Sequence, residues 1–236
     1  MPLTQPLCKL SSIAVAVAAS LSYPQLTHAQ DENPILEEVL VTASRREESL
    51  QDTSLIISAL SGENLLERGI TSMVDLAFDV PSLQVGAAGP ALQLYIRGVG
   101  TDAATGFSTP GIAVSKDGVY IPRVTAMAAN FFDLKRVEVL QGPQGTLYGR
   151  NATGGAVNLI TNGAELGETT GYVLGDVGNF NKGQFEGAVN IPLSDTMAVR
   201  VAGFAVDRSG FMDDDSSDDN RWSARVSTLW TPNEKV

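Results

Sequence analysis

The stretch from Arg136 to Thr161 places the strongest constraint on how this chain folds. An alternating apolar run stops at Gly142-Pro143, five glycines follow within fourteen residues, and a second alternating run covers residues 156–161. Glycines allow positive φ angles and close approach of one backbone to another. Composition alone therefore predicts a glycine-rich turn between two strands. The stretch reads Arg-Val-Glu-Val-Leu-Gln-Gly-Pro-Gln-Gly-Thr-Leu-Tyr-Gly-Arg-Asn-Ala-Thr-Gly-Gly-Ala-Val-Asn-Leu-Ile-Thr.

The first 29 residues are predicted to form a cleaved secretory signal peptide. Lys9 supplies a positive charge, an apolar stretch runs from Leu10 to Leu21, and Thr27-His28-Ala29 is a suitable cleavage site. A transmembrane helix is the competing interpretation. That apolar stretch is about a dozen residues, shorter than the ~20 that a spanning helix needs. Export is therefore the better prediction.

Removal of this segment excludes several kinds of chemistry. Cys8 and His28 are the only cysteine and histidine of the chain. Without them, disulfides, cysteine-based zinc sites, thiol nucleophiles and a Ser-His-Asp triad are excluded. A carboxylate-based hydrolase stays open. The net charge of −11 argues against a nucleic-acid partner, and neither a cofactor nor a metal is predicted.

The region up to about residue 162 has mixed α/β signals. Ser61 is expected to cap a helix over 63–68 that Gly69 ends. Thr71 or Ser72 is expected to cap a second helix that ends at Asp79. Asp117-Gly118 suits the type I′ turn of a hairpin between residues 112–116 and 119–121. Further strands are expected at 55–60 and 92–96.

From residue 169 apolar and polar residues alternate with the period of long β-strands, for example over 183–191, 198–206 and 222–230. Trp222 and Trp230 are expected on one face and Arg225 on the other, with the tryptophans roughly 20 Å apart along a membrane normal. A soluble β-sandwich would alternate too. The strand lengths of ~10 residues, with a tight turn at 193–195 and a long acidic loop at 209–220, favour an outer-membrane barrel. The aspartates of that loop lack EF-hand spacing and are interpreted as solvated.

Five motifs in order resemble TonB-dependent outer-membrane receptors, most closely those for iron complexes. They are Glu38–Ala43, Val80–Val85, Ile96–Gly100, Asp117–Tyr120 and the glycine-rich stretch. The resemblance implies an α+β plug domain followed by antiparallel transmembrane β-strands, the start of a barrel of about 22 strands that is incomplete here. The implied organisation is a signal peptide at 1–29, a disordered N-terminus with the TonB box at 30–48, the plug at 49–165 and the first barrel strands at 166–236.

The resemblance assigns Glu38, Val39, Leu40, Val41, Thr42 and Ala43 to a TonB box. Such a segment adds as a strand to a sheet of TonB, which an inner-membrane complex energises. The alternative is an ordinary edge strand of the domain.

The resemblance also assigns plug residues. Arg97, Arg150 and Glu138 are implied as contacts between plug and barrel, where arginines can form bidentate bonds with carboxylates. Solvent-exposed arginines are the alternative. The remaining implied plug-motif residues are Gly98, Asp117, Gly118, Gly142, Pro143, Gly145, Gly149, Gly154 and Gly155. Lys116 departs from the family pattern and is expected to alter a contact at the plug apex.

The implied function is energised uptake of a ferric complex or a similar scarce nutrient through outer-membrane lipid. About four strands cannot close a barrel, so the chain is interpreted as truncated. A soluble periplasmic plug-like binding module or a non-transporting remnant is the alternative. An enzyme that uses Asp117 and Glu138 is a third hypothesis, but the sequence offers no paired-carboxylate geometry for it. The substrate itself is not predicted.

Overall fold

The structure is a computed structural model that describes residues 40–42, 48–49, 53, 55–88, 91–101, 109–123, 131–212 and 217–232. The predicted signal peptide and residues Glu38, Val39 and Ala43 lie outside the described residues. The chain divides into a unit Met1–Glu37 and a unit Glu38–Val236. All described residues belong to the second unit.

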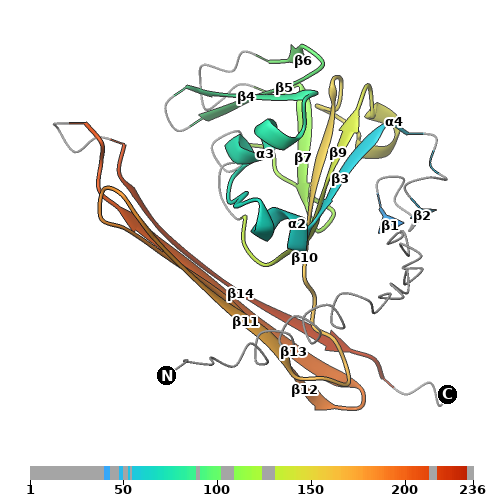
Figure 1. The fold of residues 1–236 in the computed structure, drawn as a ribbon. Coiled ribbons are helices and arrows are strands. Elements are labelled where there is room, and N and C mark those ends of the chain that lie inside the picture. Colours follow the sequence, from blue (N-terminus) through green and yellow to red (C-terminus); the bar gives the residue numbers. More distant parts are fainter. Residues whose placement is uncertain are drawn as a thin grey trace, which may run out of the picture. The chain divides into compact units, whose positions relative to one another are not determined.

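A five-stranded sheet forms the centre of the first half of this unit (Figure 1). Its order is β3-β9-β10-β7-β8, and β10 pairs parallel with β7 while the other pairs are antiparallel. The sequence alternates apolar residues along β9 and β10, and Val137, Val139 and Val157 are buried in the core. The strands are β3 (Ile57–Ser61), β7 (Ile112–Lys116), β8 (Val119–Tyr120), β9 (Leu134–Gln141) and β10 (Gly155–Thr161).

Two short helices, α2 (Gly62–Glu67) and α3 (Met73–Asp79), have the predicted caps. The hydroxyl of Ser61 accepts from the backbone N–H of Asn64, and that of Ser72 from Asp75. These bonds satisfy N–H groups that have no partner inside the helix. Leu65 of α2 and Met73 and Leu76 of α3 are buried in the core of the sheet. Leu66, Val74 and Phe78 of the same helices are exposed.

A second, three-stranded sheet consists of β4 (Leu83–Ala88), β5 (Ala91–Ile96) and β6 (Val99–Gly100) in that order. The strand predicted at 92–96 is confirmed as β5. Leu83, Leu94 and Ile96 are buried in the same core as the five-stranded sheet. The two sheets therefore share one hydrophobic interior.

The glycine-rich connection between β9 and β10 is not only a turn. It contains the one-turn helix α4 (Gly145–Tyr148), which the sequence interpretation missed. The backbone N–H of Gln144 donates to the carbonyl of Ala152 at 2.8 Å, and that of Gly142 to Gly154 at 3.1 Å. These bonds close the loop, so β10 begins directly beside the end of β9.

The hairpin between β7 and β8 is confirmed. Asp117 and Gly118 have φ angles of 49° and 78°, and a type I′ turn requires positive φ at both central residues. The carboxylate of Asp117 also accepts from the backbone N–H and hydroxyl of Thr161, at 2.8 and 2.9 Å. Asp117 thus fixes the end of β10, where the chain leaves the domain.

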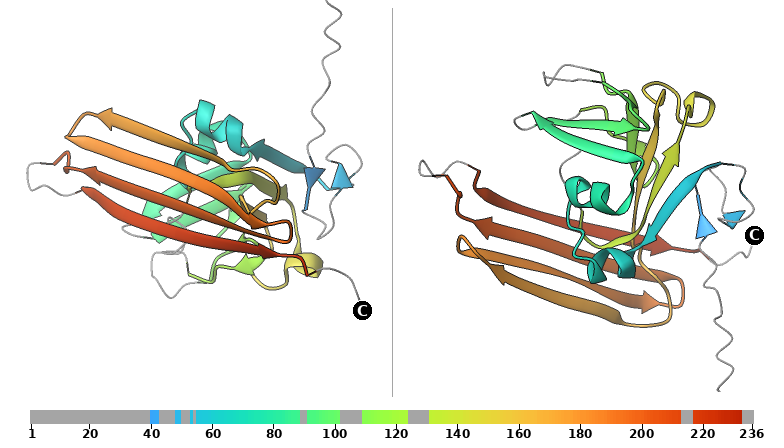
Figure 2. Two further views of the ribbon diagram at one scale, coloured as in Figure 1. Left: turned by 90° about the horizontal axis from the view of Figure 1, so that it is seen from below. Right: turned by 45° about the horizontal axis from the view of Figure 1, so that its top comes forward.

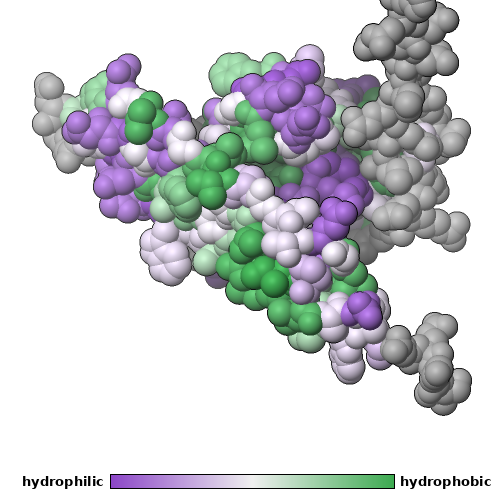
Figure 3. All heavy atoms as spheres, turned by 60° about the horizontal axis from the view of Figure 1, so that its bottom comes forward, coloured by the Kyte–Doolittle hydropathy of each residue, from purple (hydrophilic) through white to green (hydrophobic). Residues whose placement is uncertain are grey.

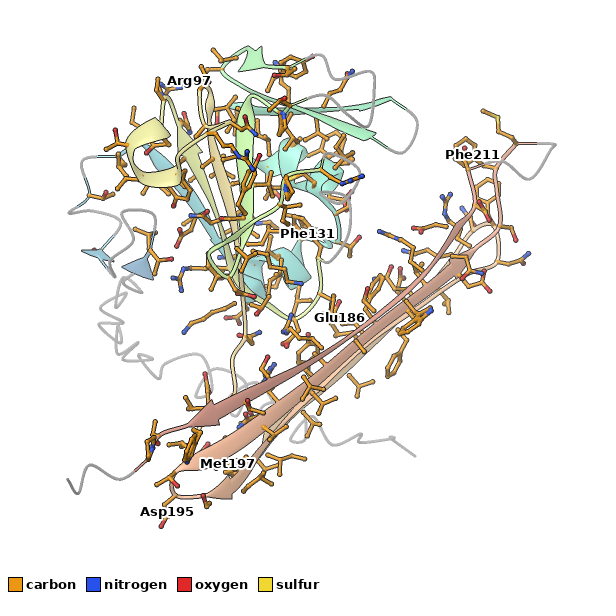
Figure 4. All side chains as sticks on the ribbon, turned by 180° about the vertical axis from the view of Figure 1, so that it is seen from behind. Arg97, Phe131, Glu186, Asp195, Met197 and Phe211 are labelled. Carbon is orange, nitrogen blue, oxygen red and sulfur yellow. The ribbon has the colours of Figure 1, made fainter. Side chains whose placement is uncertain are left out.

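The last four strands form a separate antiparallel sheet in sequence order (Figure 2). They are β11 (Thr170–Gly178), β12 (Lys182–Ser194), β13 (Met197–Arg208) and β14 (Asp219–Trp230). Figure 4 places Asp195 and Met197 at one end of this sheet and Phe211 at the other. Among the helices of the described residues, none has the length and apolar character to cross a membrane.

One face of this sheet is apolar and exposed. Trp222 and Trp230 lie on it with 79% and 70% of their surfaces accessible, and Val226 lies between them on β14. Cross-strand pairing places Val201 beside Val226 and Val189 beside Val201, and hydrophobic residues spread along the sheet in Figure 3. The prediction that both tryptophans share a face opposite Arg225 is confirmed.

A short pair of strands precedes the plug. β1 (Leu40–Val41) pairs antiparallel with β2 (Glu48–Ser49), Leu40 opposite Ser49 and Val41 opposite Glu48. Val41 has 1% of its surface accessible. The described part of the expected TonB box is therefore extended and docked.

Candidate functional site

The contact between the plug and the four-stranded sheet centres on Asp133, which is buried and has a φ of 48°. Arg200 of β13 donates to both carboxylate oxygens, with its Nε 3.0 Å from Oδ2. Arg225 of β14 donates to Oδ2 and, at 3.1 Å, to the backbone carbonyl of Asp133. Charge-assisted, bidentate bonds of this kind are strong and fix geometry. Asp133 is thus held by two neighbouring strands.

A second carboxylate completes this charge cluster. Glu186 of β12 accepts from the backbone N–H of Asp133 at 2.9 Å and from the hydroxyl of Tyr172 on β11 at 2.7 Å. Glu186, labelled in Figure 4, is buried. Asp133 is thus paired with two guanidinium groups, while Glu186 is bonded to the backbone of Asp133 and to Tyr172. Both carboxylates therefore have hydrogen-bond partners inside a desolvated interface. All four strands of the sheet contribute one side chain each.

Aromatic packing surrounds the charges. The ring of Phe132 stacks on Phe204 of β13 with centroids 6.2 Å apart. The Arg225 guanidinium lies 5.2 Å and the Lys116 Nζ 5.3 Å from the centroid of Phe132, within cation–π range. Burial and the nearby charge of Arg225 lower the pKa of Lys116, against a raising effect of Asp117. The structure therefore places Lys116 beside this interface. Its expected effect on a contact at the plug apex stays a prediction.

The segment that joins the plug to β11 is tied to the same sheet. The side-chain amide of Asn190 donates to the carbonyls of Glu165 and Glu168, both at 2.9 Å, and its oxygen accepts from the N–H of Glu165. Asn162 donates to Asp133 at 2.9 Å. These bonds satisfy the backbone of a segment that has no strand partner.

A buried polar network lies on the other side of the plug, where β1 docks. Glu138 has no accessible surface. Its Oε1 accepts from the backbone N–H of Thr42 at 2.7 Å, from the Thr42 hydroxyl at 3.2 Å and from Arg136 Nε at 2.8 Å. Its Oε2 accepts from Asn158 at 3.3 Å, and Asn158 also contacts Ser115 and Tyr148. A buried carboxylate of this kind is stable only with such partners.

The residues predicted as contacts between plug and barrel lie in different surroundings. Arg97, labelled in Figure 4, and Arg150 are exposed, and Arg150 lies 5.9 Å from the ring of Tyr120. Their contact with a barrel wall stays a prediction. Among the described residues, the hydrogen bonds of Glu138 are with Thr42 and plug residues, not with β11–β14.

The predicted plug-motif glycines have two structural roles. Gly98, Gly118, Gly142 and Gly149 have positive φ angles that glycine adopts without strain. Gly154 and Gly155 lie where a Cβ atom would come within 2.6 Å of the carbonyl of Val99 and 2.3 Å of the carbonyl of Leu140. Gly145 has open space, and Pro143 is exposed.

Sequence reasoning missed the residues that join plug and sheet: Phe132, Asp133, Glu186, Arg200 and Arg225. One signal was present, since Arg200 and Arg225 alternate with the apolar residues of their strands and so share the face opposite the tryptophans. Charged residues on that face need a partner. No group of three or more histidine, cysteine, aspartate or glutamate residues suits a metal ion within the described ranges.

Residues 49–156 match the family described as the TonB-dependent Receptor Plug Domain. The chain is 27% identical over 216 residues to an iron-regulated outer membrane virulence protein of Vibrio cholerae, covering 84% of this chain and 32% of that protein. It is 31% identical over 172 residues to the vitamin B12 transporter BtuB of Vibrio vulnificus, covering 70% and 27%. The crystal structure of the ferric yersiniabactin uptake receptor FyuA from Yersinia pestis matches with a TM-score of 0.68 at 25% identity, covering 77% and 30%.

Residues 49–156 are therefore a plug domain of the TonB-dependent receptors, and the antiparallel strands that follow match those of TonB-dependent receptor structures. The expected fold class is confirmed, and the four-stranded sheet is open. The chain spans about a quarter to a third of the length of the relatives it matches.

Proposed function

We propose that this chain is the plug and first barrel strands of an outer-membrane transporter for energised uptake of a metal chelate, such as a ferric complex. The observation that carries the proposal is the two-faced sheet joined to the plug. Its inner face binds the plug through Arg200, Arg225 and Glu186, while the opposite face exposes aliphatic residues and two tryptophans. A soluble sheet would cover such a face, whereas a barrel strand presents it to lipid.

The relatives support a proposal for the substrate class. Their names connect them with ferric yersiniabactin, vitamin B12 and iron regulation. All three names concern metals or metal complexes. We therefore place the cargo of this transporter among bulky metal chelates, and the chain works as a transporter rather than an enzyme.

The docked segment is the proposed attachment point for TonB. Leu40 and Val41 are extended, and within the described residues they pair with the two-residue strand β2. The backbone pairing described there is short and offers little resistance to their removal. An extended segment of this kind can add to the edge of a partner's sheet. TonB and its inner-membrane complex would supply the pull that moves the plug.

Deleting residues 38–43 from a full-length version is expected to abolish uptake while surface binding persists. The segment transmits force but lies outside the residues that would contact a chelate from the outer side. Radiolabelled ferric siderophores and cobalamin, added to intact cells, measure binding at low temperature and accumulation at growth temperature. Accumulation equal to that of the unaltered protein would contradict the proposal.

Replacing Val226 with arginine is expected to weaken membrane insertion by about 2–4 kcal/mol, the cost of a cation near the middle of a lipid-facing strand. Folding titrations of the full-length version into phospholipid vesicles measure this. The matched control is Gln184→Arg on the plug-facing side of β12, which we expect to change insertion little. Equal, small effects of both substitutions would show that Val226 does not face lipid.

A further inference from the structure

Thr42, Glu138 and Arg136 form a closed ring of hydrogen bonds. The Thr42 hydroxyl donates to Glu138 Oε1 at 3.2 Å and accepts from Arg136 at 3.1 Å, while Arg136 Nε donates to the same Oε1 at 2.8 Å. The hydroxyl is thus used as donor and acceptor together. Serine and threonine have this capacity, whereas valine of the same shape has neither function.

The ring connects elements that lie far apart in the sequence. Thr42 is 96 residues from Glu138, and Arg136 and Glu138 lie on β9. Glu138 is completely buried and Arg136 nearly so. Departure of Thr42 would remove two of the three hydrogen bonds at Oε1 and leave a buried carboxylate with fewer partners. The cost of an unsatisfied buried group therefore favours the docked position.

Docking at this site and pairing with a partner sheet exclude one another. The backbone N–H of Thr42 is bonded to Glu138 at 2.7 Å, the backbone of β1 is paired with β2, and Val41 is buried. Strand addition requires free backbone donors and acceptors along one edge. A partner can therefore use Thr42 only after Glu138 releases it.

We propose that Glu138 is a positioning residue that holds the segment around Thr42 in an unavailable position, and that Arg136 orients its carboxylate for this purpose. This inference rests on the proposed function of that segment as the attachment point. Glu138 and the partner would then compete for the backbone of Thr42. This role differs from the predicted contact of Glu138 with the barrel wall. Release of Thr42 then becomes the step that precedes attachment.

The test measures how often the segment leaves its site, with neither partner nor chelate present. Val41→Cys, in a Cys8→Ser background, places a single buried thiol on β1 of the full chain. Its reaction with a maleimide reports release. Thr42→Val and Glu138→Gln are each expected to increase the labelling rate about tenfold, because each removes hydrogen bonds to a charged group. Thr42→Ser keeps the hydroxyl and is expected to label at the original rate.

A second thiol separates release from loss of the fold. Val157→Cys lies in the core on β10 and is expected to stay protected in every variant. Unchanged labelling of Val41→Cys in Thr42→Val and Glu138→Gln would overturn the proposal. Equal acceleration in Thr42→Ser would overturn it too, because the hydroxyl would then be irrelevant. Joint acceleration at both thiols would assign Glu138 to the stability of the plug and likewise overturn it.

These outcomes are distinct from those of the uptake experiment. Labelling reports docking alone, so it retains its meaning even if deletion of residues 38–43 leaves accumulation unchanged. Conversely, a labelling result that overturns the role of Glu138 would not contradict the proposed transport function. The two results therefore judge the two statements separately.

Discussion

Replacing Asp133 with asparagine is expected to lower the free energy that holds the plug against β13 and β14 by about 3–5 kcal/mol. The substitution keeps the shape of the side chain but removes the negative charge. Arg200 and Arg225 would then stay buried with Glu186 as the single carboxylate of the cluster. The amide group would also present its own donors to one of the two guanidinium groups.

Native-state hydrogen exchange of the full chain, measured by mass spectrometry, gives the opening free energy of this region. Peptides that cover residues 131–133 and β13 should exchange faster, while the β3–β9 pair stays protected. The matched control is Asp79→Asn, which removes the charge from the exposed pair with Arg68 at 2.7 Å. Exposed pairs contribute at most about 1 kcal/mol, so an equal effect of both substitutions would contradict the assignment of Asp133 as the anchor.

Replacing Gly155 with alanine is expected to prevent the plug from folding, with a cost above about 4 kcal/mol. The new Cβ would lie 2.3 Å from the Leu140 carbonyl and 2.8 Å from Ile96 Cδ1, and the φ of 154° disfavours any side chain. Leu140 and Gly155 belong to paired strands, β9 and β10. Relief of the clash requires these strands to separate, and they are the central pair of the sheet.

The same motif offers a control for this prediction. Gly145 lies at the start of α4 with nothing within 4 Å of a built Cβ, and alanine is a better helix former than glycine. Gly145→Ala is therefore expected to be neutral or slightly stabilising. Hydrogen exchange in β9 and β10 should lose protection in Gly155→Ala alone. Retained protection there would show that the strands can absorb a methyl group.

Local signals in the sequence predicted much of the fold. Asp117-Gly118 gave the hairpin because its turn type depends on two adjacent residues, and the caps at Ser61 and Ser72 act within three residues. The long strands followed from alternation with a period of two. Features of this kind need no knowledge of distant parts of the chain.

The features that sequence reasoning missed depend on distant contacts or are very short. Asp133 is hydrogen-bonded to Arg200 and Arg225, which lie 67 and 92 residues away in the sequence. No local sequence pattern predicts such a pairing. α4 is four residues long and has no side-chain cap, so glycine composition indicated a turn instead. The resemblance predicted Arg97 and Arg150 as contacts between plug and barrel. Their side chains are exposed, and the described contacts between the plug and β11–β14 centre on Asp133 instead.

Quenching of tryptophan fluorescence by brominated phospholipids tests the central claim that this chain combines a plug with lipid-facing barrel strands. Trp222 and Trp230 are the only tryptophans of the chain, and both project from the exposed face of β14. In a full-length version that keeps Trp222 and Trp230 as its sole tryptophans, we expect both to be quenched in vesicles, more by bromines near the headgroups than by bromines at the chain ends, as for residues of an interfacial aromatic belt. Tryptophans that stay unquenched, with the protein folded in water without lipid, would contradict it.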